Sequence, residues 1–337
     1  MMENKKVAWI GTGVMGSQQA GHLAKNGYDV SAYTHKYEKL LELEKEFGIH
    51  PCHSTAEAVK DADYIFVMVG YPSDVEEVFC GEGGIFQSAK PGALAIDMTT
   101  SSPSLAQRLY EEGKAKGIRV MDAPVSGGDS GARNATLSIM VGGDEKDFEE
   151  ALPLFQCMGK NIILMGPAGS GQHTKAANQI AVAGATAAYT EALVYAKNAG
   201  LDPQKMLAAI GAGAAGSWQL QNMAPRALAG DFAPGFFVKH FIKDMKIVKE
   251  ESEKEGVELQ MLNAVLHMYE QMADQGLEND GTQALIKLYN KKLFQNRRGE
   301  NRSFFAALRI FVFAFSYAFT EGKSKGSPIK LEKEREQ

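Results

Sequence analysis

The chain has 337 residues, which suggests two domains at roughly 100–200 residues per domain. Hydrophobic residues make up 45% of it and charged residues 23%, as is typical of a globular protein with a buried core. The formal net charge is −5, although residues 291–337 hold eleven Lys and Arg against five Glu. The acidic remainder argues against nucleic acid as a partner. Three widely spaced cysteines predict neither a zinc site nor a disulfide framework and favour reduced thiols in the cytoplasm.

Short apolar runs alternate with helical patterns through the first half of the chain. Strands are predicted at 7–10, 30–33, 64–69, 94–97 and 120–122, and helices at 15–25 and 104–116. The run YIFVMV at 64–69 is continuously apolar, as in a strand that is covered on both faces. Residues 136–141 and 162–165 are expected to add edge strands. This alternation indicates an α/β fold with a Rossmann-type, doubly wound parallel sheet.

The sequence pattern changes near Gly171. Residues 174–199 are rich in alanine and contain no proline, which predicts a helix of about seven turns. Asp202-Pro203 is typical of the cap and first position of a following helix. We therefore expect an all-helical C-terminal domain after the sheet. The expected boundaries are 1–166 for the sheet domain, 167–296 for the helical domain and 297–337 for an atypical extension.

A glycine-rich motif follows the first predicted strand. It reads Gly11-Thr12-Gly13-Val14-Met15-Gly16, and this G-x-G-x-x-G pattern between a strand and a helix predicts binding of a dinucleotide. Gly11 permits the tight turn, and Gly13 lets the backbone approach a pyrophosphate. Gly16 lets the helix pack closely against the strand. We expect all six residues of the motif to bind the cofactor.

The end of the second predicted strand favours NADP over NAD. An NAD site usually has an acidic residue there, which binds the ribose hydroxyls. This chain reads Tyr33-Thr34-His35-Lys36 and has no acid at this position. Lys36 or His35 is suited to pair with a 2′-phosphate, so we expect Thr34, His35 and Lys36 to contact the cofactor.

Three later segments complete a recognisable set of motifs. They are Asp122-Ala123-Pro124-Val125-Ser126-Gly127-Gly128, a glycine-rich turn at 166–171 that precedes Lys175 and Asn178, and Phe232-x-Pro234-x-Phe236 followed by Lys243-Asp244. With the glycine-rich motif, they resemble the β-hydroxyacid dehydrogenase family, which includes 3-hydroxyisobutyrate dehydrogenases and tartronate semialdehyde reductases. The resemblance covers about residues 5–290 and is nearest to uncharacterised bacterial members. It implies NAD(P)-dependent hydride transfer to or from a small 3-hydroxy acid or its semialdehyde.

Lys175 is the predicted general acid/base. Reduction of a carbonyl needs a proton donor, and Lys175 lies in the first turns of a predicted helix. The helix dipole and partial desolvation both disfavour its ammonium form and are expected to lower its pKa to about 7–8. The resemblance implies the same role. Asn178, one turn further on, lies on the same helix face and is expected to bind substrate, as is Gln179, which stands where some members of the family have Asn.

A second substrate contact is expected from Ser126, Gly127 and Gly128. Small residues expose backbone N–H groups, and the serine hydroxyl adds a donor, so this segment is suited to bind a carboxylate. The resemblance places Thr100 near the nicotinamide ribose and Lys243 against the cofactor from the helical domain.

Other polar and aromatic residues are less specific. Trp218, Phe236, Phe237 and His240 are candidates for lining the pocket, although aromatic residues in a helical domain are more often core. Asp97 and Asp122 end strands and are expected to hold loops. No metal site is indicated.

Alternatives to this interpretation remain open at this point. One is a decarboxylating dehydrogenase of the 6-phosphogluconate type, which needs a pocket rich in Arg and Lys. Another is an imine reductase, which typically lacks the catalytic lysine. A third is a non-catalytic NADP-binding assembly module, against which the pair Lys175 and Asn178 argues. The long helix has apolar and small residues all round, so a homodimer or homotetramer is expected.

The segment Phe304–Phe319 does not fit the enzyme pattern. It is strongly apolar, but it contains Arg309 and is shorter than the roughly 20 residues needed to span a bilayer. It is interpreted as a helix packed on protein, a dispensable extension or an interfacial membrane anchor. The first two interpretations are favoured over membrane contact.

Overall fold

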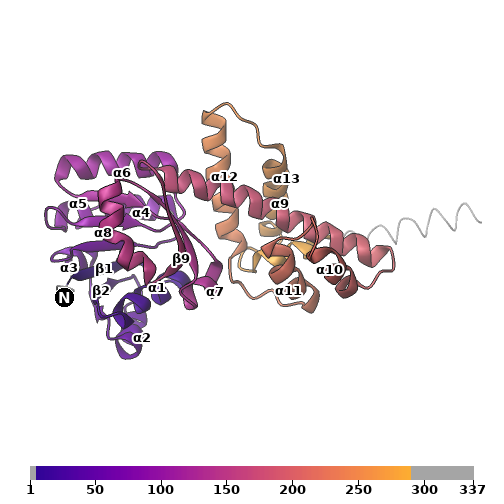
Figure 1. Cartoon of the computed structure of the whole chain (residues 1–337), viewed down its shortest axis with the longest axis horizontal. Coiled ribbons are helices and arrows are strands. Elements are labelled where there is room, and N and C mark those ends of the chain that lie inside the picture. The colour runs from indigo at the N-terminus through magenta and orange to yellow at the C-terminus, as the bar shows by residue number, and fades with distance from the viewer. Residues whose placement is uncertain (1–4, 290–337) are drawn as a thin grey trace, which may run out of the picture. The chain divides into compact units, whose positions relative to one another are not determined.

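The computed structural model describes residues 5–289, and residues 5–286 belong to one compact unit. Its N-terminal part, the sheet lobe (residues 5–166), contains a nine-stranded sheet in the order β3-β2-β1-β4-β5-β6-β8-β7, with β9 paired to β8 (Figure 1). The strands are β1 Lys6–Ile10, β2 Asp29–Tyr33, β3 His50–Pro51, β4 Tyr64–Val67, β5 Leu94–Asp97, β6 Arg119–Asp122, β7 Val125–Ser126, β8 Leu137–Gly142 and β9 Gly159–Gly166. From β3 to β6 the pairs are parallel, which confirms the predicted doubly wound parallel sheet.

The part of the sheet beyond β6 is not wholly parallel. Strand β8 runs antiparallel to β6 and β7 and parallel to β9. Only residues 127–136 separate β7 from β8, which is less than a parallel crossover needs. The prediction of 136–141 as an edge strand was therefore wrong, because β8 lies inside the sheet. The helices of this lobe are α1 Val14–Lys25, α2 Tyr37–Phe47, α3 Thr55–Val59, α4 Pro72–Cys80, α5 Ile85–Ser88, α6 Pro103–Lys116, α7 Gly128–Arg133 and α8 Glu145–Gln156.

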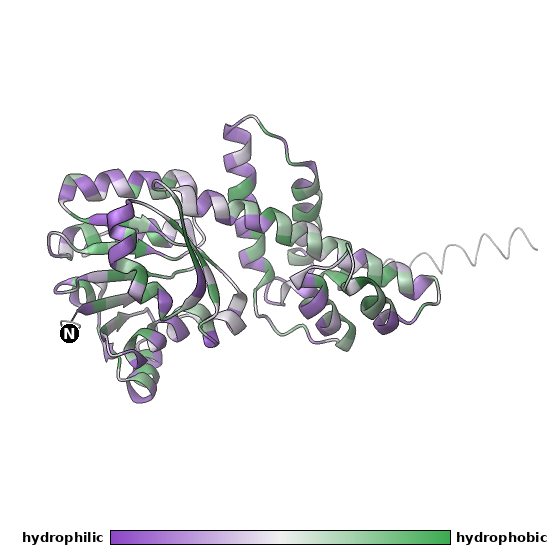
Figure 2. Ribbon diagram, viewed as in Figure 1, coloured by the Kyte–Doolittle hydropathy of each residue, from purple (hydrophilic) through white to green (hydrophobic). Residues whose placement is uncertain are grey.

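The central strands are buried on both faces of the sheet. Alternate side chains of one strand enter two separate cores, so Trp9 lies in one core and Ala8 in the other. Trp9 stacks on Phe66 of the neighbouring strand β4 with ring centroids 5.2 Å apart. This double burial explains why these strands are continuously apolar in sequence. In Figure 2 the strands are largely green, whereas the outer surfaces of the helices carry much of the purple.

The C-terminal part of the unit, the helical lobe (residues 170–286), contains no strand in the described residues and confirms the predicted helical region. Its elements are α9 Ser170–Asn198, α10 Pro203–Gly211, η1 Gln219–Met223, α11 Ala224–Ala229, α12 Val238–Lys254, α13 Gln260–Ala273 and η2 Thr282–Leu285. Helix α9 packs against α12 and α13. Asp202 caps α10 as predicted, since its Oδ1 accepts hydrogen bonds from the N–H groups of Gln204 and Lys205 at 2.8 and 3.3 Å.

The predicted extension begins beyond the described residues. The apolar segment Phe304–Phe319 therefore lies outside them. Between residues 5 and 289, no helix combines the length and apolar character that crossing a membrane requires.

Candidate active site

The glycine-rich turn connects β1 to α1 at the carboxyl end of the parallel strands. Gly11 has a φ of +97°, and a side chain there would collide with the carbonyl oxygen of Met68. A side chain at Gly16 would collide with the carbonyl oxygen of Gly11. Gly13 is exposed and has no atom within 4 Å of the place where a Cβ would stand. The turn therefore has the tight bend, the close helix packing and the open backbone that a dinucleotide phosphate site requires.

A cavity of about 710 Å³ lies against this turn. It is lined by all six residues of the motif and by Met68–Gly70, which follow the adjacent strand β4. The strand order reverses between β1 and β4, which is where doubly wound sheets bind nucleotides. The hydroxyl oxygen of Thr12 lies buried at this wall, and no described residue hydrogen-bonds it. The Thr12 hydroxyl and the open backbone at Gly13 thus fit a dinucleotide phosphate.

Most of the predicted cofactor residues reach this cavity. Its lining includes Gly11, Thr12, Gly13, Val14, Met15, Gly16, Thr34, His35, Thr100 and Lys243. Lys36 is not part of the lining; it is exposed and precedes α2, whereas Lys39, one turn further on, lines the cavity. Sequence reasoning also missed Ser54 and Thr55, which line it from the start of α3. Ser54 accepts a hydrogen bond from the N–H of Glu57, and the S-x-x-E signature of such a cap was a usable signal.

Two buried carboxylates hold loops at the strand ends, as predicted. Asp122 lies at the end of β6 and accepts hydrogen bonds from the N–H groups of Gly169 and Gln172 at 2.7 and 2.8 Å. It therefore caps the N-terminus of α9. Asp97 accepts a hydrogen bond from the N–H of Thr99 at 2.9 Å. Burial raises the pKa of Asp122 to about 6 and that of Asp97 to about 7.

Lys175 is buried on α9, with 7% of its surface exposed. Burial is the main cause that lowers its pKa to about 8; Asp244 opposes the shift, and Lys243 contributes to it. The predicted lowering is confirmed, but its main cause is desolvation. Lys175 is in the second turn of α9, and the effect of a helix dipole falls off within the first turn.

A hydrogen-bonded network joins Lys175's helix to α12. Lys243 donates a hydrogen bond to the carbonyl oxygen of Thr100 at 2.6 Å and forms an ion pair with Asp244 at 3.0 Å. The amide of Gln179 donates to the other carboxylate oxygen of Asp244 at 2.6 Å and accepts from Asn178 at 2.7 Å. Gln179 was expected at the substrate, but its length lets it reach Asp244, and both ends of its buried amide are used within the protein.

The predicted carboxylate-binding segment lies between β7 and α7. Gly127 and Gly128 have φ angles of +135° and +63°, which explains why glycine occupies both positions. Ser126 and Gly128 are half-buried and Gly127 is exposed. Together with Lys175 and Asn178, these residues lie outside the lining of the 710 Å³ cavity.

Lys243 and Asp244 connect the residues that line the cavity to Lys175, which lies outside the lining. Both line the cavity, and both act electrostatically on Lys175. The buried lysine is therefore coupled electrostatically to two residues of the cavity wall, on the helix α12 against which α9 packs.

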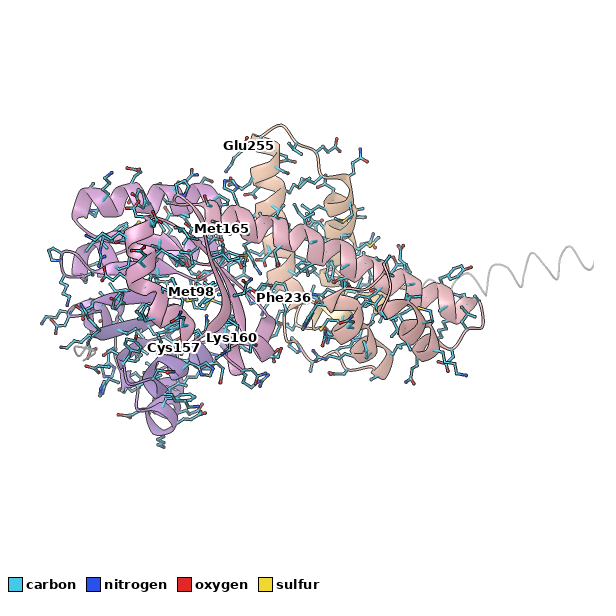
Figure 3. The ribbon with its side chains drawn as sticks, viewed as in Figure 1. Met98, Cys157, Lys160, Met165, Phe236 and Glu255 are labelled. Carbon is cyan, nitrogen blue, oxygen red and sulfur yellow. The ribbon has the colours of Figure 1, made fainter. Side chains whose placement is uncertain are left out.

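The loop before α12 brings aromatic residues to the same cavity. Phe236, Phe237 and His240 line it, whereas Trp218 is 54% exposed and is not part of the lining. Phe236 lies on the side of the helical lobe that faces the sheet lobe (Figure 3). Burial is the main cause that lowers the pKa of His240. Across residues 5–289, no cluster of three or more His, Cys, Asp or Glu is arranged to hold a metal ion.

A glycine-rich turn at the switch point of a doubly wound sheet, together with a buried lysine of low pKa, defines the class of NAD(P)-dependent oxidoreductases. Residues 6–166 match the family model for the NAD-binding domain of 6-phosphogluconate dehydrogenase. Residues 169–289 match the model described as NAD-binding of NADP-dependent 3-hydroxyisobutyrate dehydrogenase. The chain belongs to the β-hydroxyacid dehydrogenase family, which contains the 3-hydroxyisobutyrate dehydrogenases, and this confirms the resemblance seen in the motifs.

The matches to individual relatives cover almost the whole length of each relative. The chain is 50% identical over 287 residues to the uncharacterised oxidoreductase YkwC of Bacillus subtilis, covering 85% of this chain and 99% of that protein. It is 36% identical over 294 residues to the 2-hydroxy-3-oxopropionate reductase of Escherichia coli, covering 86% and 99%. A structure of Mycobacterium tuberculosis 3-hydroxyisobutyrate dehydrogenase with L-serine superposes with a TM-score of 0.77 at 28% identity, covering 85% and 99%.

Proposed function

We propose that this protein transfers a hydride between a nicotinamide cofactor and the hydroxyl-bearing carbon of a small 3-hydroxy acid or its semialdehyde. The observation that carries the proposal is Lys175. It is buried and coupled electrostatically to Lys243 and Asp244, which line the cofactor-sized cavity, and its pKa is about 8. At that pKa both the ammonium and the amine are available near neutral pH, as a general acid/base requires.

Different residues bind the cofactor, transfer the proton and bind the substrate. The turn Gly11–Gly16, with Thr100 and Lys243, would hold the cofactor, and the nicotinamide ring supplies or accepts the hydride when it is bound. In reduction, the ammonium of Lys175 gives a proton to the carbonyl oxygen. In oxidation, its neutral amine removes the hydroxyl proton. Ser126, Gly127 and Gly128 bind the substrate carboxylate and Asn178 contacts the substrate, which limits the positions that the reacting carbon can take.

The printed names of the relatives support a small acid as substrate. One relative is a reductase of 2-hydroxy-3-oxopropionate, and the other was solved with L-serine. Both compounds are carboxylic acids of three carbons with oxygen on the carbon β to the carboxylate. This chemistry suits a carboxylate-binding segment near a proton-transferring lysine.

A substrate panel tests this proposal. 3-Hydroxyisobutyrate, L-serine, 2-hydroxy-3-oxopropionate, succinate semialdehyde and glyoxylate are assayed with both cofactors, in the wild type and in Lys175→Ala. We expect turnover of at least one member, and a loss of about 100-fold or more in Lys175→Ala with cofactor binding retained. Turnover of that member in the variant at the wild-type rate would refute the mechanism. Cofactor binding without turnover of any compound would favour a non-catalytic binding module.

We propose further that NADP is preferred over NAD. His35 and Lys39 line the cavity just after β2, where the ribose 2′-position lies in such sites, and no acid stands between Tyr33 and Lys36. Lys39→Ala is expected to raise the Kd of NADPH about tenfold, the loss of one charged contact, and to change that of NADH less than twofold. Lys36→Ala is the matched comparison. A larger effect at Lys36 would assign the phosphate to that residue, and equal effects on both cofactors would argue against a 2′-phosphate contact.

The proposed organisation keeps the expected boundaries: a cofactor domain at 1–166, a substrate domain at 167–296 and an extension at 297–337. A cytoplasmic homodimer or homotetramer is proposed as well. Large apolar side chains on the helical lobe support assembly, since Tyr195 is 74% exposed and Trp218 is 54% exposed. Light scattering coupled to size exclusion tests this, and a monomer at micromolar concentration would contradict it.

A further inference from the structure

Gln172 connects the helix of Lys175 to the loop that follows β5. It is 1% exposed, and both ends of its amide are used. Its Oε1 accepts a hydrogen bond from the N–H of Ser101 at 3.0 Å, and its Nε2 donates one to the carbonyl oxygen of Thr99 at 2.7 Å. The residue between these two is Thr100, whose carbonyl oxygen accepts the hydrogen bond from Lys243. One side chain therefore fixes the loop on both sides of the point where α12 attaches.

The contacts continue from Lys243 back to the same helix. Lys243 pairs with Asp244, and Asp244 accepts a hydrogen bond from Gln179. Gln172 and Gln179 stand three residues before and four residues after Lys175, so all three share one face of α9. The hydrogen-bonded ring, which we define as Gln172, residues 99–101, Lys243, Asp244 and Gln179, thus begins and ends on the helix face that carries Lys175. Within it, Lys243 and Asp244 are joined by their ion pair and the other links are hydrogen bonds.

We propose that Gln172 is a positioning residue for the reaction: through the hydrogen-bonded ring it holds Lys175 in register with the cavity wall. This inference rests on the proposed role of Lys175 as general acid/base. Asp122 also fixes the start of α9, but it binds only backbone N–H groups and does not reach α12. Gln172 is the point where a side chain of α9 binds the loop that holds Lys243.

The main test is Gln172→Met, which keeps the length of the side chain and removes both hydrogen bonds. We expect kcat to fall about tenfold, since a misplacement near 1 Å can cost up to about 100-fold. The Kd of the cofactor should stay within about twofold, because the glycine-rich turn is untouched. The apparent pKa in the pH–rate profile should rise towards the ordinary lysine value, because loosening the ring admits water to Lys175.

Tyr269→Phe is the matched control. It removes one buried hydrogen bond, from the Tyr269 hydroxyl to the carbonyl oxygen of Thr282, outside the hydrogen-bonded ring. We expect a lower Tm with unchanged kcat and an unchanged pH profile. Equal losses of kcat in both variants would show that Gln172 has only a general structural role.

Gln172→Glu keeps the inference testable if the methionine variant does not fold. A neutral carboxyl can accept from the N–H of Ser101 and donate to the carbonyl oxygen of Thr99, whereas an ionised one cannot donate. Asp122 and Asp97 lie nearby and favour the neutral form. The variant should therefore approach the wild-type kcat for reduction at pH 5 and lose it as the pH rises through the pKa of the new carboxyl. A kcat whose pH dependence matches the wild type would overturn the inference.

The roles of Lys175 and Gln172 can be refuted separately. If Lys175→Ala keeps wild-type turnover, the proposed function is wrong. If Lys175→Ala is inactive while Gln172→Met keeps the wild-type kcat and pH profile, the proposed function stands and the role of Gln172 is wrong.

Discussion

Lys175 is held in a site that disfavours its own charge. Its pKa falls from 10.5 to about 8 because the folded protein removes water from the ammonium. The folded state therefore bears a free-energy cost at neutral pH that a neutral side chain would not cause. Proteins retain such a destabilising charge where the amine has a catalytic role. Replacing Lys175 should therefore affect stability and activity in opposite directions.

Lys175→Met should be inactive and yet more stable than the wild type at pH 7. The pKa shift of Lys175 sets a ceiling of about 3 kcal/mol on the gain in unfolding free energy. The ammonium is present in both states below pH 8, so the gain is full there, and it fades between pH 8 and 10.5. Denaturant unfolding at pH 7 and pH 10.5 measures it. A variant that is destabilised at pH 7 would contradict this reading of the burial.

At the residue scale, local patterns predicted well what depends on near neighbours. The three glycines of the turn follow from a short segment, whereas the partners of Asp122 and the burial that lowers the pKa of Lys175 come from distant parts of the chain. The link from Gln179 to Asp244 joins residues 65 positions apart, and no local pattern encodes it. The substrate contact expected of Gln179 stays a prediction, but its hydrogen bond to Asp244 could not be predicted from the sequence.

At the scale of elements, α9 depends on a cap that comes from the sheet. The helix begins at Ser170, earlier than the alanine-rich segment predicts. The reason is Asp122 on β6, whose two oxygens accept the backbone N–H groups of Gly169 and Gln172. A side chain at Gly171 would collide with the carbonyl oxygen of Met140, so this start also needs a glycine. Composition alone shows neither condition, because both partners lie on distant strands.

Asp122→Asn should remove one of the two acceptors of this cap and affect both stability and turnover. One acceptor becomes an NH₂ group that faces a backbone N–H, which is expected to cost about 1–2 kcal/mol. Asp202→Ala removes the oxygen that accepts both N–H groups at the cap of α10, away from the site. We expect a lower Tm in both variants and a lower kcat only in Asp122→Asn. Loss of kcat in Asp202→Ala as well would show that cap loss acts through general destabilisation.

At the scale of the whole molecule, the sheet lobe and the helical lobe are joined at several points. The hydrogen-bonded ring is one, and a contact of Ser104 on α6 with Glu251 on α12 at 2.7 Å is another. The order of the parallel strands and the helical second half were predictable because alternation and strand burial leave a strong periodic signal. The antiparallel insertion of β8 was not, because it depends on the length of one connection.

Removal of residues 297–337 should leave the enzyme intact. The family match ends at residue 289, and the Bacillus subtilis relative is covered over 99% of its own length. The shortened chain is expected to keep kcat and KM within about twofold, since contacts of the described site all lie before residue 290. Steady-state assays and size exclusion of both forms check this. A loss of activity or a change of oligomeric state would assign a role to the extension.

The most direct measurement of the central claim is the pH dependence of kcat/KM in both directions, on the wild type and on Lys175→Ala. The wild type should show reduction falling and oxidation rising through a shared midpoint near pH 8, because reduction needs the ammonium and oxidation needs the amine. The variant should lose both limbs together with most of its rate. Profiles that are flat from pH 6 to 10, or limbs that persist in Lys175→Ala, would contradict the account.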